Sequence, residues 1–214
     1  ISRGRFRNTA LLDGYRNYID GKILKNRISQ TKTENLIVDR SDDSWLTGRE
    51  HNKTYKKISE HKVAIVGCGS VGSSVSRLLL QSGIRKMMLW DDDLMKSENS
   101  SRHLLGFDSV YKNKALALAS RLREEFPNAY IEAFNEDWTE DSKNNQKIAE
   151  ADIIVSCTAH WNTEQQLIKR QSEDILGAIV FAFVEAHAMA GHVIVNQVDS
   201  NAFNSWHITE GKYI

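Results

Sequence analysis

The residues best suited to chemistry in this chain begin with a glycine loop, Gly67-Cys68-Gly69-Ser70-Val71-Gly72. This G-x-G-x-x-G pattern follows a short apolar run and opens a stretch with helical periodicity. In that setting Gly67 permits a tight turn, Gly69 lets the backbone approach a phosphate, and Gly72 lets the helix and strand pack closely. The helix N-terminus offers N–H groups and a positive dipole end to an anion. The loop therefore predicts nucleotide binding.

Asp91 lies 24 residues after Gly67, at the end of a second apolar run. An acidic side chain at that place accepts hydrogen bonds from the ribose hydroxyls of a bound nucleotide. The glycine loop and Asp91 serve an NAD-dependent enzyme and an ATP-dependent enzyme equally, so both remain open on these residues alone.

Four polar residues near Asp91 separate the two alternatives: Asp93, Asn99, Arg102 and Lys114. A hydride-transfer enzyme needs a planar pocket for nicotinamide and has no evident use for a carboxylate, an amide and two cations beside the ribose. Attack of a carboxylate on the α-phosphate of ATP builds negative charge on that phosphate and on the departing pyrophosphate, which fixed cations and amide donors stabilise. Arg102 suits a bidentate clamp and Lys114 a point charge, so this set favours adenylation.

The same residues resemble a known family. Asp91-x-Asp93, Asn99-x-x-Arg102 and the Val110–Ala115 segment are similar to the D-x-D, N-x-x-R and G-x-x-K-A motifs of the superfamily of ubiquitin-activating enzymes, MoeB and ThiF. The resemblance covers roughly residues 49–197 and includes Pro127-Asn128, where relatives carry the reverse dipeptide. This combination of motifs is far more specific than the glycine loop.

The resemblance implies a function. The chain is expected to adenylate the C-terminal carboxylate of a small ubiquitin-like (β-grasp) carrier protein with ATP and Mg²⁺, and thioester transfer is expected to follow if a catalytic cysteine is present. Gly67, Gly69 and Gly72 would hold the phosphates and Asp91 the ribose, while Asn99, Arg102 and Lys114 would surround the α-phosphate and pyrophosphate. Asp93 is expected to belong to the nucleotide-binding set with Asp91. A homodimer is implied, and Arg49 is near the place where relatives donate an arginine across the dimer.

Two alternatives stay open beside adenylation. One is a non-catalytic scaffold or dimerisation domain with the same fold, and the other is an NAD(P)-dependent oxidoreductase. The scaffold is favoured by a departure from the family, because the turn after the fourth predicted strand reads Ser156–Trp161 and lacks the usual aspartate. The metal ligands in the protein are therefore unknown, and Mg²⁺ would rely on ATP oxygens and on Asp93 or another acid. His160 in this turn is interpreted as a loop histidine.

The two cysteines point away from thiol chemistry and zinc. Cys68 is expected to be a small packed residue, and Cys157 to be buried rather than reactive. Either the chain stops at adenylation or the thiol-bearing part lies outside it. There is no C-x-x-C pair, and His187 and His192 form no recognisable zinc ligand set. Glu185 is an ordinary strand-end acid or a contact for an incoming peptide tail.

The elements that must position these residues alternate between strand and helix. Buried strands are predicted over residues 63–66, 87–90, 130–134, 153–156, 178–184 and 191–198. Helices are predicted from Val71 to Gly83, from Ala115 to Phe126 and over 162–172. This alternation predicts an α/β fold, a doubly wound, Rossmann-like, mostly parallel sheet. Trp138, Trp161 and Trp206 are expected to pack in its core or at its rim.

Three segments are expected along the chain: a polar lead-in over residues 1–60, the Rossmann-like adenylation domain over 61–198 and a tail over 199–214. Because the first residue is Ile1, the chain is expected to be a piece of a longer protein. Arg3, Arg5 and Arg7 are interpreted as a solvated cluster.

Composition excludes several classes of partner. Lys+Arg and Asp+Glu are both 28, so the formal net charge is zero, and neither nucleic acid nor a membrane is expected as a partner. No run approaches 18 apolar residues and no secretory signal opens the chain. With two cysteines and no disulfide framework, a cytoplasmic location is expected.

Overall fold

The computed structural model describes residues 21–30, 38–40, 42–46, 53–139, 146–173 and 176–197. The chain divides into two compact units, Ile1–Asp39 and Arg40–Ile214. In the first unit the described helix is α1 (Gly21–Gln30). The site lies in the second unit, to which the rest of this description refers. None of the described helices is long and apolar enough to cross a membrane.

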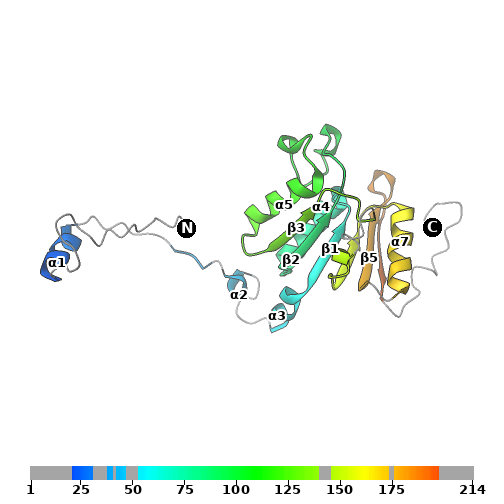
Figure 1. Cartoon of the computed structure of the whole chain (residues 1–214). Helices are drawn as coiled ribbons and strands as arrows, with labels where there is room; N and C mark the ends of the chain where they lie inside the picture. The colour runs from blue at the N-terminus through cyan, green and yellow to red at the C-terminus, as the bar shows by residue number, and fades with distance from the viewer. Residues whose placement is uncertain are drawn as a thin grey trace. The chain divides into compact units, whose positions relative to one another are not determined.

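A six-stranded sheet forms the centre of the second unit (Figure 1). Its strand order is β3-β2-β1-β4-β5-β6, with parallel pairing throughout except between β5 and β6, which are antiparallel. This arrangement confirms the predicted doubly wound, mostly parallel sheet. The strands are β1 (Lys62–Val66), β2 (Lys86–Trp90), β3 (Tyr130–Phe134), β4 (Ile153–Ser156), β5 (Ala178–Val184) and β6 (Gly191–Asn196).

Side chains of β1 alternate between two hydrophobic clusters, one on each face of the sheet. Val63 and Ile65 join the cluster that contains the apolar residues of α4 (Ser70–Ser82) and α5 (Lys114–Glu125). Ala64 and Val66 join the other cluster, to which α7 (Trp161–Ser172) contributes Leu167 and Ile168. Because both faces are covered, the inner strands are buried on both sides, which explains their continuous apolar runs.

The helices begin and end at residues with suitable backbone preferences. Gly83 ends α4 in a left-handed conformation (φ 115°), which confirms the predicted stop signal. Asn113 precedes α5 and its side chain accepts a hydrogen bond from Leu116 N–H. The chain then turns away from the helix at Phe126, directly before Pro127.

Part of the predicted lead-in belongs with the sheet unit. The short α2 (Asp43–Leu46) and α3 (Lys53–Glu60) precede β1, and Ile58 of α3 packs against the core. The boundary at residue 60 stays a prediction. Arg49, Trp206, the arginines of residues 3–7 and the tail 199–214 lie outside the described residues.

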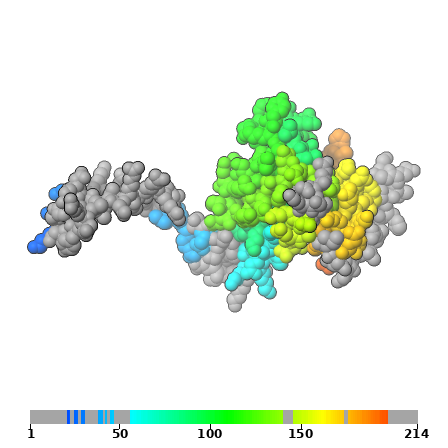
Figure 2. Space-filling view, in the orientation of Figure 1, coloured from blue at the N-terminus to red at the C-terminus, as the bar shows by residue number. Residues whose placement is uncertain are grey.

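The carboxyl ends of the parallel strands converge at one edge of the sheet. β1 and β4 are neighbours there, and the crossovers that follow them run in opposite directions, which is where doubly wound folds bind ligands. The segment from β2 to α5 contains the turns η1 (Ser97–Asn99) and η2 (Phe107–Ser109) and projects as a lobe above this edge (Figure 2). The turn η3 (Ala186–Ala188) joins β5 to β6.

Candidate functional site

The glycine loop has the geometry that its sequence predicts. Gly67 adopts φ +87°, a conformation that side-chain-bearing residues rarely take. A Cβ atom on Gly72 would lie 1.9 Å from the carbonyl oxygen of Gly67, so only glycine fits there. A Cβ on Gly69, by contrast, would meet no described atom within 4 Å. Protein packing therefore requires the first and third glycines, whereas the second faces open space.

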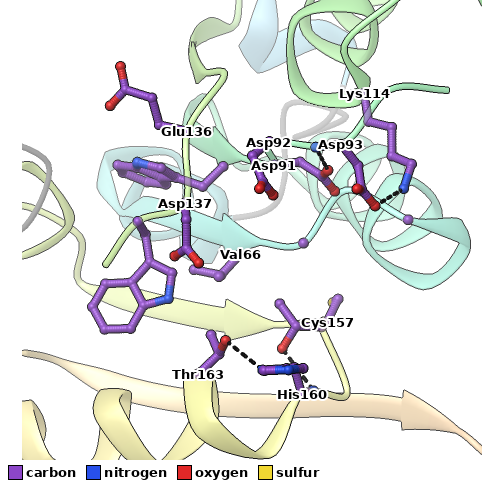
Figure 3. A pocket seen from close by; sticks show the side chains of 15 residues that line it. Val66, Asp91, Asp92, Asp93, Lys114, Glu136, Asp137, Cys157, His160 and Thr163 are labelled. Carbon is purple, nitrogen blue, oxygen red and sulfur yellow. Dashed lines mark hydrogen bonds and ion pairs between the residues drawn. The ribbon is translucent and has the colours of Figure 1, made fainter. Parts of the chain in front are cut away.

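That open space is a cleft of about 500 Å³, called here the glycine-loop cleft (Figure 3). Its volume lies within the range of roughly 300–1,000 Å³ that is typical of small-molecule sites. The ends of β1, β2, β3 and β4 contribute to its walls. The lining residues that matter here are Gly67, Gly69, Asp91, Asp93, Lys114, Asp137, Cys157, Thr158 and His160.

Asp91 both lines the cleft and holds the glycine loop. Its Oδ2 accepts a hydrogen bond from Cys68 N–H at 2.6 Å, and its Oδ1 accepts one from Asp93 N–H at 2.9 Å. Burial raises the pKa of the Asp91 carboxyl, and the two backbone donors and Lys114 act in the opposite direction. Asp91, the residue predicted to bind the ribose, therefore lines the cleft. It also holds the glycine loop in place, a structural role that the sequence did not indicate.

Lys114 forms an ion pair with Asp93 at the mouth of the cleft. The Nζ and Oδ2 atoms are 2.6 Å apart, and the Lys114 side chain is 11% exposed against 68% for Asp93. The predicted phosphate-binding cation is thus held inside the site by Asp93, an acid of the predicted nucleotide-binding set. An anion that enters the cleft would compete with Asp93 for this ammonium group.

Asn99 and Arg102 lie on a second cavity of about 250 Å³, called here the Arg102 cavity. It shares Gly69, Lys114 and Cys157 with the glycine-loop cleft, and also contains Ser70 and Val71 from the start of α4. The Arg102 side chain is turned partly back, since its Nη1 donates to the carbonyl oxygen of Glu98 at 3.2 Å. The structure therefore brings the predicted residues Asn99, Arg102 and Lys114 together around one space.

Two buried residues of the site, His103 and Asn113, were not identified as site residues from the sequence. His103 contacts the carbonyl oxygen of Cys68 through its Nε2 at 2.6 Å. The Asn113 amide Nδ2 contacts the carbonyl oxygens of Asp91 and Asp93 at 2.7 Å and 3.2 Å. An asparagine directly before a predicted helix is a recognisable N-cap and could have been found, whereas His103 carries no such local signal.

Residues 46–202 match the ThiF family. The chain belongs to this family. The match covers most of the chain and includes the glycine loop, the lobe and all six strands.

Curated relatives of this ThiF-family chain include proteins of ubiquitin-like systems. It is 31% identical over 135 residues to the ATP-dependent ubiquitin transferase-like protein Cap2 of Pseudomonas aeruginosa, covering 59% of this chain and 24% of Cap2. It is 27% identical over 186 residues to ubiquitin-like modifier-activating enzyme 5 of Drosophila mojavensis, covering 80% of this chain and 46% of that protein. The chain thus spans less than half the length of each of these relatives.

Solved structures agree with the ThiF-family fold. Escherichia coli MccB, solved with ATP, has a TM-score of 0.56 and 27% identity over 61% of this chain and 39% of MccB. The E. coli tRNA N6-threonylcarbamoyladenosine dehydratase TcdA has a TM-score of 0.57 at 21% identity, over 68% of this chain and 61% of TcdA, which supports the fold alone.

The cysteines of this ThiF-family chain are not activated. Cys68 is fully buried, and burial raises the pKa of its thiol well above the ordinary value. Cys157 lines both cavities, yet burial raises the pKa of its thiol to about 12. Because the thiolate is the nucleophile, neither cysteine suits thioester formation at neutral pH.

The metal side of the site also differs from the family pattern. Thr158 and His160 line the glycine-loop cleft after β4, and Asp137 lines it after β3. His160 is exposed, and its Nδ1 is 3.3 Å from Thr163 Oγ1. Among the described residues, no group of three His, Cys, Asp or Glu side chains is arranged to hold a metal ion. Mg²⁺ bound to a triphosphate needs only one or two carboxylates, and Asp93 fits that lesser requirement.

Proposed function

We propose that this chain adenylates the C-terminal carboxylate of a small ubiquitin-like carrier protein with ATP. The observation that carries this proposal is the meeting of two cavities at Gly69 and Lys114. One cavity is lined by the glycine loop and Asp91, and the other contains Asn99 and Arg102. A nucleotide in the first cavity would present its phosphates to Lys114 at the junction, and a carboxylate could approach through the second, which Arg102 lines.

In the proposed reaction a carboxylate oxygen attacks the α-phosphorus of ATP. The bond between the α-phosphorus and the oxygen that bridges to the β-phosphate breaks, which yields an acyl-adenylate and pyrophosphate. Arg102, Lys114 and Asn99 would stabilise the negative charge that develops on the α-phosphate and on the leaving group. Asp91 would hold the ribose, and Mg²⁺, held by ATP oxygens and Asp93, would neutralise phosphate charge when bound.

The family supports ATP as the nucleotide, because MccB has been solved with ATP. The relatives differ in what they act on. Cap2 and ubiquitin-like modifier-activating enzyme 5 carry names from ubiquitin-like systems, whereas MccB has been solved with MccA and another relative is a tRNA threonylcarbamoyladenosine dehydratase. A ubiquitin-like carrier is proposed because the names of several curated relatives refer to ubiquitin-like systems. The formal net charge of zero does not favour RNA as a partner.

Pyrophosphate–ATP exchange in the presence of a panel of ubiquitin-like carriers tests the proposal. Carrier-dependent exchange is expected, and Lys114→Ala and Arg102→Ala should each lower its rate by about 100-fold or more, since each removes a charge that the transition state needs. Lys112→Ala is the matched control, because Lys112 is an exposed lysine of the same lobe that lines neither cavity. Absence of exchange with every carrier would contradict the proposed reaction.

Two observations favour the scaffold alternative. Lys114 is paired with Asp93, and the turn after β4 supplies no carboxylate. A scaffold would bind ATP without exchange, or would not bind it. An oxidoreductase would prefer NADH to ATP in a competition assay.

The homodimer implied by the family resemblance remains part of the proposal. Sedimentation equilibrium over a range of concentrations would detect it. If the chain sediments as a monomer at all concentrations while exchange proceeds, the second copy is not needed for adenylation.

A further inference from the structure

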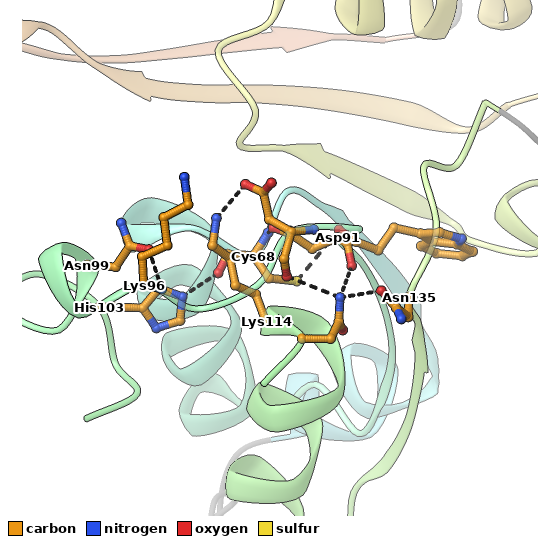
Figure 4. Close-up of polar contacts among 10 residues, drawn as sticks. Cys68, Asp91, Lys96, Asn99, His103, Lys114 and Asn135 are labelled. Atoms are coloured by element: carbon orange, nitrogen blue, oxygen red, sulfur yellow. Dashed lines mark hydrogen bonds and ion pairs between the residues drawn. The ribbon is translucent and has the colours of Figure 1, made fainter. Parts of the chain in front are cut away.

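The backbone of Cys68, between the first two glycines of the loop, is held at both its N–H and its carbonyl oxygen. Its N–H donates to Asp91 Oδ2 at 2.6 Å, and the carbonyl oxygen of Cys68 contacts His103 Nε2 at 2.6 Å. Figure 4 shows Asp91 and His103 on either side of Cys68. These contacts orient the chain immediately before Gly69, where α4 begins without a side-chain cap.

The hydrogen bonds of the ring determine which nitrogen carries its proton. Leu105 N–H donates to His103 Nδ1 at 3.0 Å, so Nδ1 must accept and is unprotonated. The proton is therefore on Nε2, which donates to the Cys68 carbonyl oxygen. His103 is buried, and burial lowers its pKa. The hydrogen bond to Cys68 acts in the opposite direction, and the nearby cations Lys114 and Arg102 act in the same direction as burial. The neutral ring satisfies both of these contacts, whereas a second proton would face the N–H of Leu105.

The segment that carries His103 is also bonded to α4. Leu104 N–H donates to the hydroxyl oxygen of Ser73 at 3.3 Å, and Ser73 is completely buried. His103 directly follows Arg102, so the same few residues attach the lobe to the loop and carry the predicted phosphate clamp. A shift of the loop relative to this segment would change the distance from Gly69 to Arg102.

We propose that His103 is a positioning residue that holds the glycine loop in its nucleotide-binding conformation and in register with Arg102. It acts through the carbonyl oxygen of Cys68, as a neutral donor from Nε2. The charged groups around the ring are Arg102 on its own segment and Lys114 from α5, and Asp91 is bonded to the N–H of Cys68. The proposal rests on the proposed function only in naming ATP as the nucleotide.

Two substitutions distinguish the hydrogen bond from His103 to Cys68 of the loop from the hydrogen bond that Leu105 N–H donates to His103. In His103→Gln, the amide nitrogen can reach the place of Nε2 and donate to Cys68. In His103→Asn, the side-chain oxygen can accept from Leu105 N–H, but the side chain is too short to reach Cys68. We expect His103→Gln to bind ATP within about threefold of the wild type and His103→Asn to bind it about tenfold more weakly.

Hydrogen exchange of the amides of residues 67–72 is measured alongside, in the full chain without nucleotide. Faster exchange is expected in His103→Asn than in His103→Gln, since the loop loses its hydrogen bond to residue 103. Equal ATP affinity and equal exchange in the two variants would overturn the proposal. If the wild type binds no ATP, the proposed function fails, and the exchange measurement still decides the role of His103.

The pH dependence of ATP affinity gives a readout that does not require His103→Asn to fold. As the pH is lowered below 6.5 toward the lowered pKa of folded His103, wild-type affinity should fall when the ring gains a proton, and His103→Gln, which cannot be protonated, should lose less. Asp91 titrates in both proteins, so it cancels in the comparison. Identical profiles would contradict a role for the neutral ring.

Discussion

At the residue scale, Gly69 and Gly72 share a residue type but differ in their surroundings. A methyl group on Gly69 enters the glycine-loop cleft, where it meets no described atom within 4 Å, and the backbone there has φ −69°, which alanine accepts. A methyl group on Gly72 collides with the carbonyl oxygen of Gly67 at 1.9 Å. One position therefore belongs to ligand space and the other to the fold.

Gly69→Ala is therefore expected to cost less than about 1 kcal/mol of the free energy of unfolding and to weaken ATP binding at least about tenfold. Gly72→Ala should destabilise by about 3 kcal/mol or more, because the backbone must move. Urea denaturation and calorimetric titration with ATP measure the two effects. Unchanged ATP affinity in Gly69→Ala would show that the phosphates do not lie against this glycine.

The Lys114–Asp93 ion pair leads to a second prediction. In Asp93→Asn the lysine loses its carboxylate partner, so ATP should bind in the presence of EDTA as tightly as to the wild type or several-fold more tightly. The stimulation of exchange by Mg²⁺ should fall by about tenfold, since a metal-binding carboxylate is lost. Asp92→Asn is the control, as Asp92 lies in the same cleft and has no hydrogen bond to Lys114 among the described contacts. Equal responses of both variants to Mg²⁺ would argue against a metal at Asp93.

The glycine loop, Asp91 and Lys114 could be identified from the sequence because they lie at strand ends and helix starts, and Asn99 and Arg102 because they match the N-x-x-R motif. The structure brings them around two adjoining cavities, while their individual roles remain predictions. The pairing of Lys114 with Asp93 and the bond from His103 to Cys68 were not predictable. The first joins residues that are 21 positions apart and the second joins residues that are 35 positions apart. Both depend on the orientation of a side chain, which no periodicity in the sequence encodes.

At the element scale, the start of α5 depends on Asn113. Its Oδ1 accepts from Leu116 N–H at 2.9 Å, and its Nδ2 contacts the carbonyl oxygens of Asp91 and Asp93 and the Oδ1 of Asn135. One side chain thus joins the helix that begins with Lys114 to the end of β2 and to the residue after β3.

Asn113→Ala should lower the free energy of unfolding by about 2–3 kcal/mol, because it removes both the cap and the buried donor. Asn113→Asp keeps a good cap but replaces the donor with a carboxylate facing backbone carbonyl oxygens. It should be destabilised at least as much as the alanine variant. If the aspartate variant is as stable as the wild type in urea denaturation, capping alone explains the residue.

The strands were predictable because burial on both faces of the sheet produces short, continuous apolar runs in the sequence. The helices were predictable because their apolar residues recur at helical spacing. All six predicted strands are present, with β3, β4 and β5 at the predicted bounds and β6 ending at Asn196 rather than at residue 198. The lobe between β2 and α5 was not predictable. Its short turns are held by single hydrogen bonds, such as Tyr111 N–H to the carbonyl oxygen of Met95 at 2.8 Å, and such bonds leave no repeat in the sequence.

At the scale of the whole molecule, His103 makes stability depend on pH. Its pKa in the folded protein is lowered from 6.5, so between that lowered value and 6.5 the unfolded chain binds more protons. Stability should therefore fall as the pH drops through 6.5 toward the folded-state pKa. Asp91, whose pKa is raised from 3.8, acts in the opposite direction at lower pH.

Urea denaturation of the wild type and of His103→Gln, at a series of pH values from about 7.5 to about 5.5, isolates this contribution. The wild type should lose more stability on acidification than the variant. Every other titratable group is the same in both proteins, so its effect cancels in the difference. Parallel curves would show that His103 is not held neutral in the folded state.

The reversal of β6 determines where further polypeptide can be attached. β1 is entered from α3 at its amino end, and the antiparallel β6 returns the chain from the cleft to that same end of the sheet. Both covalent connections of the sheet therefore leave from the back, on the side opposite the two cavities. Fused modules, affinity tags or surface tethers placed at these connections would start on the side of the sheet opposite the two cavities.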